Sequence, residues 1–192
     1  NQVAKYADEW VAVNAGQDGA WWMAVNHVLL TEAHHQRQVP YFIEYTKRYT
    51  DAPLLVEIQE VQDGLYRPGQ LLRAGRLAPY SGVENPDWKF LMWDLPTGQP
   101  KMPMGTVGFR WGKELGKWNL QMQDGLDGSA IDPALTLLGG ADEVVQVEFD
   151  DFGEAAALAR GVPVKRVRTA DGTEVLVATV YDLLMAQFGV AR

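Results

Sequence analysis

The chain has 192 residues, 47% of them hydrophobic, so it is long enough and apolar enough to bury a core of its own. Its formal net charge of −8 argues against a nucleic acid as partner, because proteins that bind phosphate backbones carry basic patches. The absence of cysteine excludes disulfide bonds, thiolate zinc sites and cysteine-ligated iron–sulfur clusters within the chain. No run of about 18 apolar residues occurs, so we predict no direct insertion into a membrane.

The first predicted element is a short strand at 9–14, which ends in a turn that contains Gly16 and Gly19. Glycine adopts positive φ at little cost, so the chain is expected to reverse here. Asp18 stands where the N-cap of a following helix belongs, with a carboxylate that can accept hydrogen bonds from the first backbone N–H groups. This pattern predicts a strand, a turn and a helix in succession.

The helix after this turn is expected to begin at Gly19 or Ala20 and to run to about residue 34. Apolar side chains occupy most of its circumference, which is typical of a buried helix. We therefore expect Trp21 and Trp22 to lie in the core, with a stacking surface for a ring as the alternative.

A second helix is predicted at 40–49, because Pro40 suits the first helical position, where its missing N–H group costs nothing. The run Leu-Leu-Val-Glu-Ile at 54–58 is nearly continuous in apolar residues and indicates a strand inside a parallel sheet. Together these elements predict a β-turn-α-α-β unit and the α/β fold class.

Turns dominate the middle of the chain. The Asp-Gly pair at 63–64 predicts a hairpin turn, and Arg-Pro-Gly at 67–69 predicts another turn. The aromatic run at 88–93 predicts a strand that a turn at 94–98 joins to a short partner at 101–104.

The remaining segments are a mixture of loops, strands and helices. The stretch 105–123, rich in glycine, tryptophan and basic residues, is not expected to form a regular helix; it is either a surface excursion held by two buried tryptophans or an ordered functional or interface loop. The others are a strand at 143–149, a short helix at 154–160, a hairpin over 164–178 with an Asp-Gly turn, and an amphipathic helix at 180–188 that Gly189 ends.

The one feature that resembles a site is the turn made by Gly16, Gln17 and Asp18 in front of a helix. Backbone N–H groups and the helix dipole favour a phosphate there, and the carboxylate of Asp18 could instead accept from a guanine edge. A glycine turn before a helix is also common without any ligand, so the pattern leaves a purely structural role open. The spacing of His27, His34 and His35 does not suit a metal site, and we predict neither a catalytic residue nor a metal ligand.

Several blocks in the same order resemble a known family. The turn and helix resemble the molybdopterin oxidoreductases related to dimethyl sulfoxide reductase. The remaining blocks are similar, more closely, to the large catalytic subunit of membrane-bound respiratory nitrate reductase. The blocks are GQDGA at 16–20, MAVNHVL at 23–29, YF at 41–42, RYTDAPLLV at 48–56, VGFRWG at 107–112, GKWNL at 116–120, PVKR at 163–166, ADG at 170–172 and VATVYDL at 177–183.

The resemblance implies an internal fragment of a longer subunit and a Rossmann-like β-α-β unit of a molybdopterin-dinucleotide-binding domain. Residues 1–60 would form the cofactor-binding part, 61–160 an irregular and β-rich insertion, and 161–192 a hairpin with a C-terminal helix. Gly16, Gln17 and Asp18 would contact bis(molybdopterin guanine dinucleotide) molybdenum. The family turn usually reads Gly-Thr-Asp-Ala, whereas an amide replaces the threonine hydroxyl here. The ligands of molybdenum and of a 4Fe-4S cluster would lie outside this chain.

The resemblance also implies a reaction and partners. The parent enzyme would reduce nitrate to nitrite with electrons from quinol, which would arrive through an iron–sulfur beta subunit and a membrane haem gamma subunit. It would sit peripherally on the cytoplasmic face of the cell membrane, with an outward-facing variant left open. The isolated chain is expected to be inactive.

Two alternatives stay open. The parent could be another molybdopterin oxidoreductase of the same group, one that oxidises nitrite or reduces chlorate or selenate. A non-catalytic α/β nucleotide-binding module would also account for the acidic composition and the single glycine turn.

Overall fold

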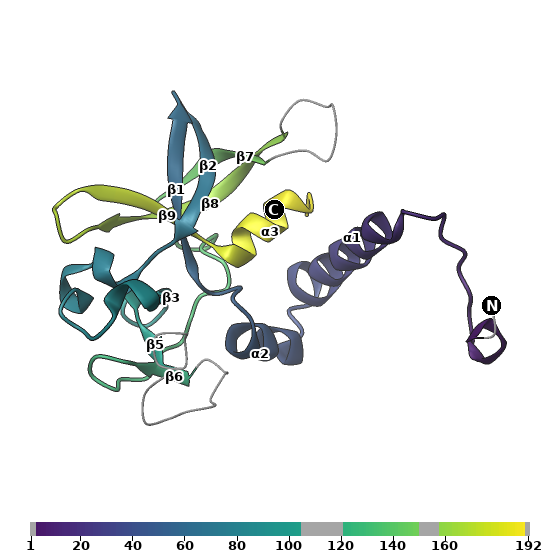
Figure 1. Cartoon of the computed structure of the whole chain (residues 1–192), viewed down its shortest axis with the longest axis horizontal. Helices are drawn as coiled ribbons and strands as arrows, with labels where there is room; N and C mark the ends of the chain where they lie inside the picture. The colour runs from purple at the N-terminus through teal and green to yellow at the C-terminus, as the bar shows by residue number, and fades with distance from the viewer. Residues whose placement is uncertain (1–2, 105–120, 150–157, 191–192) are drawn as a thin grey trace.

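The computed structural model describes residues 3–104, 121–149 and 158–190, and its centre is a closed barrel of five strands (Figure 1). Neighbouring strands are antiparallel, apart from the parallel pair β2 and β7. The first strand pairs directly with the last, so the barrel joins distant parts of the chain. In barrel order the strands are β1 (Leu55–Gln62), β2 (Leu65–Leu71), β7 (Glu143–Phe149), β8 (Leu158–Arg168) and β9 (Glu174–Thr179).

The barrel is filled by branched apolar side chains that alternate along the strands. In β7, Val145 and Val147 are buried, whereas the side chain of Val144 points to the opposite face and is 58% exposed. The helix α3 (Val180–Gln187) follows β9 and adds Leu183 and Ala186 to the same core. This alternation explains why β7 is readable as a strand in the sequence.

Two small sheets and three short 3-10 turns pack beside the barrel. The sheets are β3 (Met92–Asp94) with β4 (Gln99–Lys101), and β5 (Pro103–Met104) with β6 (Gln121–Asp124). Leu55 of β1 belongs to the apolar cluster that joins the barrel to this region. The 3-10 turns are η3 (Ala74–Arg76), η4 (Ala78–Tyr80) and η5 (Pro86–Trp88).

The N-terminal part is helical and leads away from the barrel (Figure 1). The 3-10 turn η1 (Val3–Tyr6) comes first, then α1 (Asp18–Leu29), which continues directly into the π-helical η2 (Leu30–Gln36), and finally α2 (Pro40–Tyr49). In the described residues, no helix is long and apolar enough to cross a membrane.

The mixed α/β class is confirmed, and so are the elements whose signals are local. Helix α2 begins at Pro40 as predicted. The hairpin turn at 63–64 joins β1 to β2, with Gly64 at φ +73°. The turn at 171–172 joins β8 to β9, and Gly189 follows α3 at positive φ.

The expected strand at 9–14 does not form, and β1 lies in no parallel pair. Residues 9–14 are irregular and exposed, so the β-turn-α-α-β unit lacks its first strand. Both neighbours of β1 are antiparallel to it. The barrel is closed and offers no free edge, and residues 9–14 run beyond α1, away from the strands, so no partner strand lies beside them (Figure 1).

In the part of the chain that the structure describes, the first helix, α1, has no buried residue. Trp21 is 41% exposed and Trp22 is 60% exposed, so the expectation that both lie in the core is wrong for the described structure. Their rings contact each other edge to face, with 4.9 Å between the ring centroids.

Three shorter predictions also need correction. The segment 67–69 is not a turn but lies inside β2, where a shift of register beside Pro68 accommodates proline and glycine. The strand predicted at 88–93 is confined to its last residues, because β3 starts at Met92. The helix predicted at 154–160 is wrong at its end, since residues 158–160 belong to β8; its earlier part and the 105–120 loop lie outside the described residues.

Candidate functional site

The turn before α1 is built by local backbone geometry. Gly16 has φ +83°, and the N–H of Gln17 donates to the carbonyl of Asn14 at 3.0 Å, which closes the turn. The first helical hydrogen bond runs from the N–H of Trp21 to the carbonyl of Gln17 at 3.1 Å. The N–H groups of the first helical turn therefore have no acceptor inside the helix and point out of its end.

The structure corrects the capping role predicted for Asp18. Gln17 occupies the N-cap position, and its side chain makes no capping hydrogen bond. Asp18 is instead the first helical residue, where its negative charge interacts favourably with the positive end of the helix dipole. The closed turn at Asn14 brings Gln17, rather than Asp18, to the helix entrance.

The turn is open on its outer side. Gly16, Gln17, Asp18 and Gly19 are all exposed, and a Cβ atom added to either glycine would meet no other atom within 4 Å. The three predicted site residues thus lie together on one exposed turn. Uncapped N–H groups, a helix dipole and one carboxylate at the same place can bind a group that carries both a phosphate and hydrogen-bond donors.

The histidines do not form a metal site. In the described part of the chain, no group of three or more histidine, cysteine, aspartate or glutamate side chains is arranged to hold a metal ion. His27 Nδ1 lies 2.8 Å from the carbonyl oxygen of Phe188, which ties α1 to the end of α3. His34 is buried against the ring of Tyr181, and burial, followed by the charge of His35, lowers the pKa of His34.

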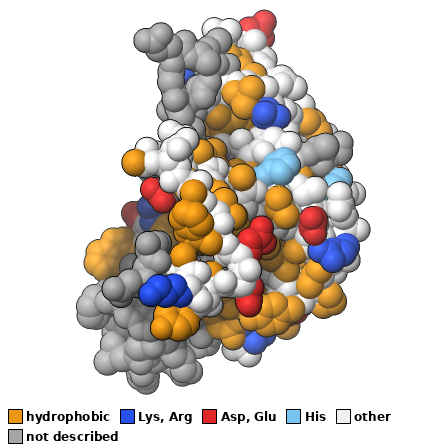
Figure 2. All heavy atoms as spheres, turned by 90° about the vertical axis from the view of Figure 1, so that its right-hand side faces the viewer, with side chains coloured by type: hydrophobic (Ala, Val, Ile, Leu, Met, Phe, Trp, Pro, Cys, Tyr) orange, Lys and Arg blue, Asp and Glu red, His pale blue; other side chains and the backbone are white. Residues whose placement is uncertain are grey.

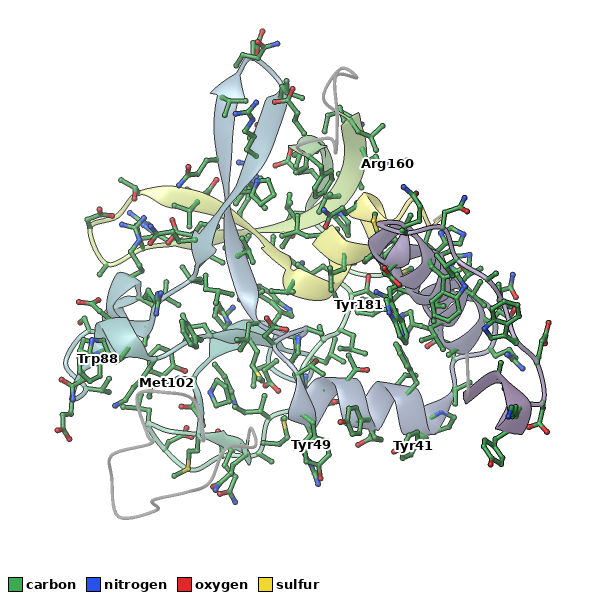
Figure 3. All side chains as sticks on the ribbon, turned by 45° about the vertical axis from the view of Figure 1, so that its right-hand side comes forward. Tyr41, Tyr49, Trp88, Met102, Arg160 and Tyr181 are labelled. Carbon is green, nitrogen blue, oxygen red and sulfur yellow. The ribbon has the colours of Figure 1, made fainter. Side chains whose placement is uncertain are left out.

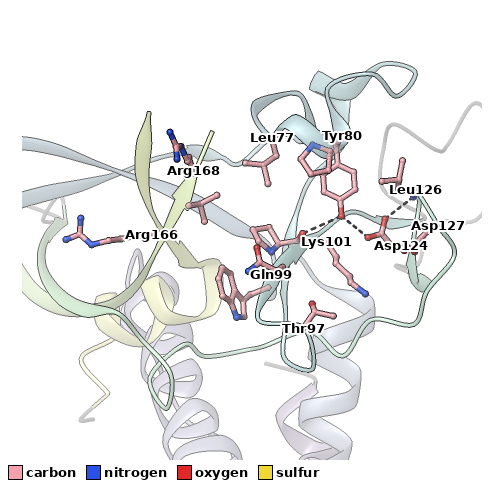
Figure 4. A pocket seen from close by; sticks show the side chains of 14 residues that line it. Leu77, Tyr80, Thr97, Gln99, Lys101, Asp124, Leu126, Asp127, Arg166 and Arg168 are labelled. Atoms are coloured by element: carbon pink, nitrogen blue, oxygen red, sulfur yellow. Dashed lines mark hydrogen bonds between the residues drawn. The ribbon is translucent and has the colours of Figure 1, made fainter. Parts of the chain in front are cut away.

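A separate pocket of about 500 Å³ lies between β8 and the β3–β4 hairpin (Figure 4). The hydroxyl of Tyr80 donates to Asp124 Oδ2 at 2.7 Å across its floor. Burial, together with this hydrogen bond, raises the pKa of Tyr80 far above its ordinary value, so the phenol stays protonated. Sequence reasoning missed this pocket, because its walls come from segments that only the tertiary structure brings together.

Two charged groups of this pocket, Lys101 and Arg166, have partners in the protein. Lys101 Nζ donates to Ser129 Oγ at 2.9 Å and lies 3.5 Å from Asp94. Arg166 forms ion pairs with Glu143 and Glu174. These contacts link β4 to the segment after β6, and β8 to its neighbours β7 and β9.

Comparison with known proteins identifies relatives that match the whole chain. It is 41% identical to respiratory nitrate reductase 1 alpha chain from Escherichia coli, with 100% of this chain and 16% of the relative covered. It is 37% identical to nitrate reductase alpha chain from Bacillus subtilis over 98% of this chain and 15% of the relative. It is 38% identical to nitrate reductase alpha subunit from Mycobacterium tuberculosis, with the same coverage. No protein-family profile matches the chain.

The segment, with its α/β fold and its open glycine turn at a helix start, is related along its whole length to alpha chains of reductases. The chain matches nitrate reductase alpha chains along its whole length and spans about 16% of the length of these relatives. The predicted resemblance is therefore confirmed.

Proposed function

We propose that the chain is part of the molybdenum-containing catalytic subunit of a respiratory nitrate reductase. The whole enzyme reduces nitrate to nitrite with electrons from quinol, delivered through an iron–sulfur beta subunit and a membrane haem gamma subunit. The observation that carries this proposal is the identity of 34–41% to nitrate reductase alpha chains over nearly every residue of the chain. In this proposal the subunit is peripheral, on the cytoplasmic face of the membrane.

Within that enzyme, the turn of Gly16, Gln17 and Asp18 would contact bis(molybdopterin guanine dinucleotide) molybdenum. The exposed turn fits a dinucleotide, because the first N–H groups of α1 can donate to a phosphate and the positive φ of Gly16 keeps side-chain bulk away. Asp18 repels a phosphate, so we assign its carboxylate to the N–H donors of the guanine edge. When bound, the group supplies oxygen-atom transfer at molybdenum.

We propose that the molybdenum ligand and the 4Fe-4S ligands lie in other parts of the subunit; this chain has no cysteine with which to hold an iron–sulfur cluster. We accordingly expect no nitrate turnover from these 192 residues by themselves.

The proposal is tested on the parent polypeptide purified from its native source. Molybdenum content is measured by mass spectrometry of metals, and nitrate-dependent oxidation of reduced viologen is followed in the same preparation. Molybdenum together with nitrate turnover supports the proposal. A preparation with neither would support the non-catalytic α/β nucleotide-binding module instead, and turnover of chlorate or selenate without nitrate turnover would transfer the chain to another enzyme of the group.

The role of the turn is tested by Asp18→Ala in the full-length subunit. We expect lower molybdenum and guanine nucleotide content per subunit, because the guanine donors lose their acceptor. Asp8→Ala is the matched control, since Asp8 is an exposed aspartate shortly before the turn. Equal cofactor content in the two variants would show that Asp18 does not contact the cofactor, and it would leave the proposed enzyme unaffected.

A further inference from the structure

Helix α1 exposes an unusually apolar surface. Of its twelve residues, all of them described, none is buried. Trp22 is 60% exposed, and Val28 and Leu29 are each 49% exposed. Only Asp18, Asn26 and His27 interrupt the apolar and glycine residues, so the exposed surface extends around the helix rather than along one stripe.

Helix α2 adds a row of tyrosines. Tyr41, Tyr45 and Tyr49 lie one turn apart and are 77%, 49% and 50% exposed, with ring centroids 6.0 Å and 5.0 Å apart. In Figure 3 the labelled Tyr41 and Tyr49 point away from the rest of the molecule. Figure 2 looks onto the side from which α1 projects and shows hydrophobic side chains spread across that face. We call the exposed side chains of both helices the α1–α2 surface; they are Trp21, Trp22, Val28, Leu29, Tyr41, Tyr45 and Tyr49.

We propose that the α1–α2 surface is a docking surface for the remainder of the same alpha chain, which encloses α1 on several sides. More than four fifths of each relative's length lies outside the segment that matches this chain. A helix that is apolar around its circumference is normally buried, in the core of a large protein or across a membrane, and the twelve residues of α1 are too few to span a membrane. These two observations point to the same polypeptide as the occupant.

The charge pattern of α1 disfavours a lipid surface as the occupant. Helices that lie in a membrane interface have one apolar face and a polar face rich in lysine and arginine. Helix α1 has no lysine or arginine and no continuous polar face. The net charge of −8 would also repel the anionic lipids that attract such helices.

Packing on the α1–α2 surface would also fix the position of the turn at Gly16. In the described residues, helix α1 is held near its C-terminal end, by the contact of His27 with Phe188 after α3 and by its continuation into η2. Packing along α1 would therefore hold the opposite end of the helix, where Asp18 lies, in one position. The docking proposal itself needs only the family relationship and stands whether or not the turn binds a cofactor.

The test is hydrogen exchange, resolved by peptide, on the full-length subunit. We expect the amides of α1 to exchange slowly in the wild type and about tenfold faster or more in Trp22→Asp, because a buried carboxylate would expel the helix from its packing. Trp88→Asp is the matched control: Trp88 is 53% exposed and lies at the other end of the molecule in Figure 3. This control should leave α1 protection unchanged.

Three results would overturn the proposal. The first is exchange of α1 amides in the wild type as fast as in Trp22→Asp. The second is protection that disappears on dilution together with a dimer, which would assign the surface to a second copy. The third is protection that appears only after addition of vesicles of phosphatidylcholine and phosphatidylglycerol, which would assign it to lipid. None of these results depends on molybdenum content or nitrate turnover.

Discussion

Gly16 and Gly19 flank the candidate turn, but only Gly16 has a backbone conformation that requires glycine. Gly16 has φ +83°, in the left-handed region, whereas Gly19 lies in the first turn of α1 with an ordinary helical backbone. Neither position is crowded, because an added Cβ would meet no atom within 4 Å. The difference between the two positions is therefore purely conformational.

Gly16→Ala is expected to destabilise the turn by roughly 1–2 kcal/mol, since an alanine in the left-handed region brings its Cβ against the backbone. Gly19→Ala should instead stabilise α1 by about 0.5–1 kcal/mol, because alanine loses less backbone freedom in a helix. Hydrogen exchange of the first turn of α1 in the parent subunit measures both. Faster exchange in Gly19→Ala than in Gly16→Ala would contradict the described turn.

Asp171 shows how a fully exposed carboxylate acquires a perturbed pKa from local hydrogen bonds. The hydroxyl of Thr169 donates to it at 2.5 Å, and Thr173 donates from its N–H at 3.0 Å and from its hydroxyl at 2.8 Å. These bonds, the first from Thr169, lower the pKa of Asp171 from 3.8 to about 2.

The sign of the pH dependence follows from that lowered pKa. The stabilisation by ionised Asp171 is fully present above pH 3.8 and is lost as the pH falls through about 2. We expect Asp171→Asn to weaken the pH dependence of the urea midpoint of the chain over that range. If the urea midpoints of the wild type and of Asp171→Asn changed in parallel with pH, the hydrogen bonds from Thr169 and Thr173 would not favour the ionised form of Asp171.

Thr179 caps the N-terminus of helix α3. Its hydroxyl accepts from the N–H of Asp182 at 3.0 Å, as an N-cap does, and donates to the carbonyl of Leu135 at 2.7 Å. Asp182 in turn accepts from the N–H of Leu137 at 2.8 Å and from the hydroxyl of Thr136 at 2.7 Å. Since Thr179 and Asp182 are buried, these bonds attach the loop around Leu135 to the helix that closes the barrel.

Thr179→Val keeps the volume of the side chain and removes the hydroxyl. We expect a loss of about 2 kcal/mol in the free energy of unfolding, because the cap is lost and the carbonyl of Leu135 remains buried without its donor. Thr179→Ser keeps both hydrogen bonds and should cost about 1 kcal/mol for the missing methyl group. Urea unfolding compares the variants, and an equal loss in both would show that the hydroxyl contributes little.

The barrel and the helical N-terminal part differ in how completely their apolar side chains are buried. The barrel encloses its own core, with Val147, Val162 and Val164 fully buried. Helix α1 has no buried residue, although its sequence is that of a core helix. The contrast is explained if the chain contains the whole core of one unit and only part of the core of another, which the coverage of the relatives also indicates.

Turns and helix ends could be predicted from the sequence, because they depend on residues that are neighbours in the chain. The turns at 63–64 and 171–172, the start of α2 at Pro40 and the end of α3 at Gly189 were all predictable, because glycine and proline restrict or permit particular backbone angles wherever they occur. The resemblance to nitrate reductase alpha chains was also readable from ordered blocks of residues, and a turn at Gly16 was correctly predicted to lie before a helix, although Asp18 is the first residue of that helix and not its N-cap.

Only the tertiary structure decided which strands pair and which surfaces are covered. The pairing of β1 with β9 and the parallel pairing of β2 with β7 join residues far apart in the chain, and no local pattern encodes a partner. The run at 9–14 has strand-forming residues but no free barrel edge to pair with, and so it remains irregular. Burial has the same non-local origin, because an apolar helix such as α1 is buried only where other parts of the protein surround it.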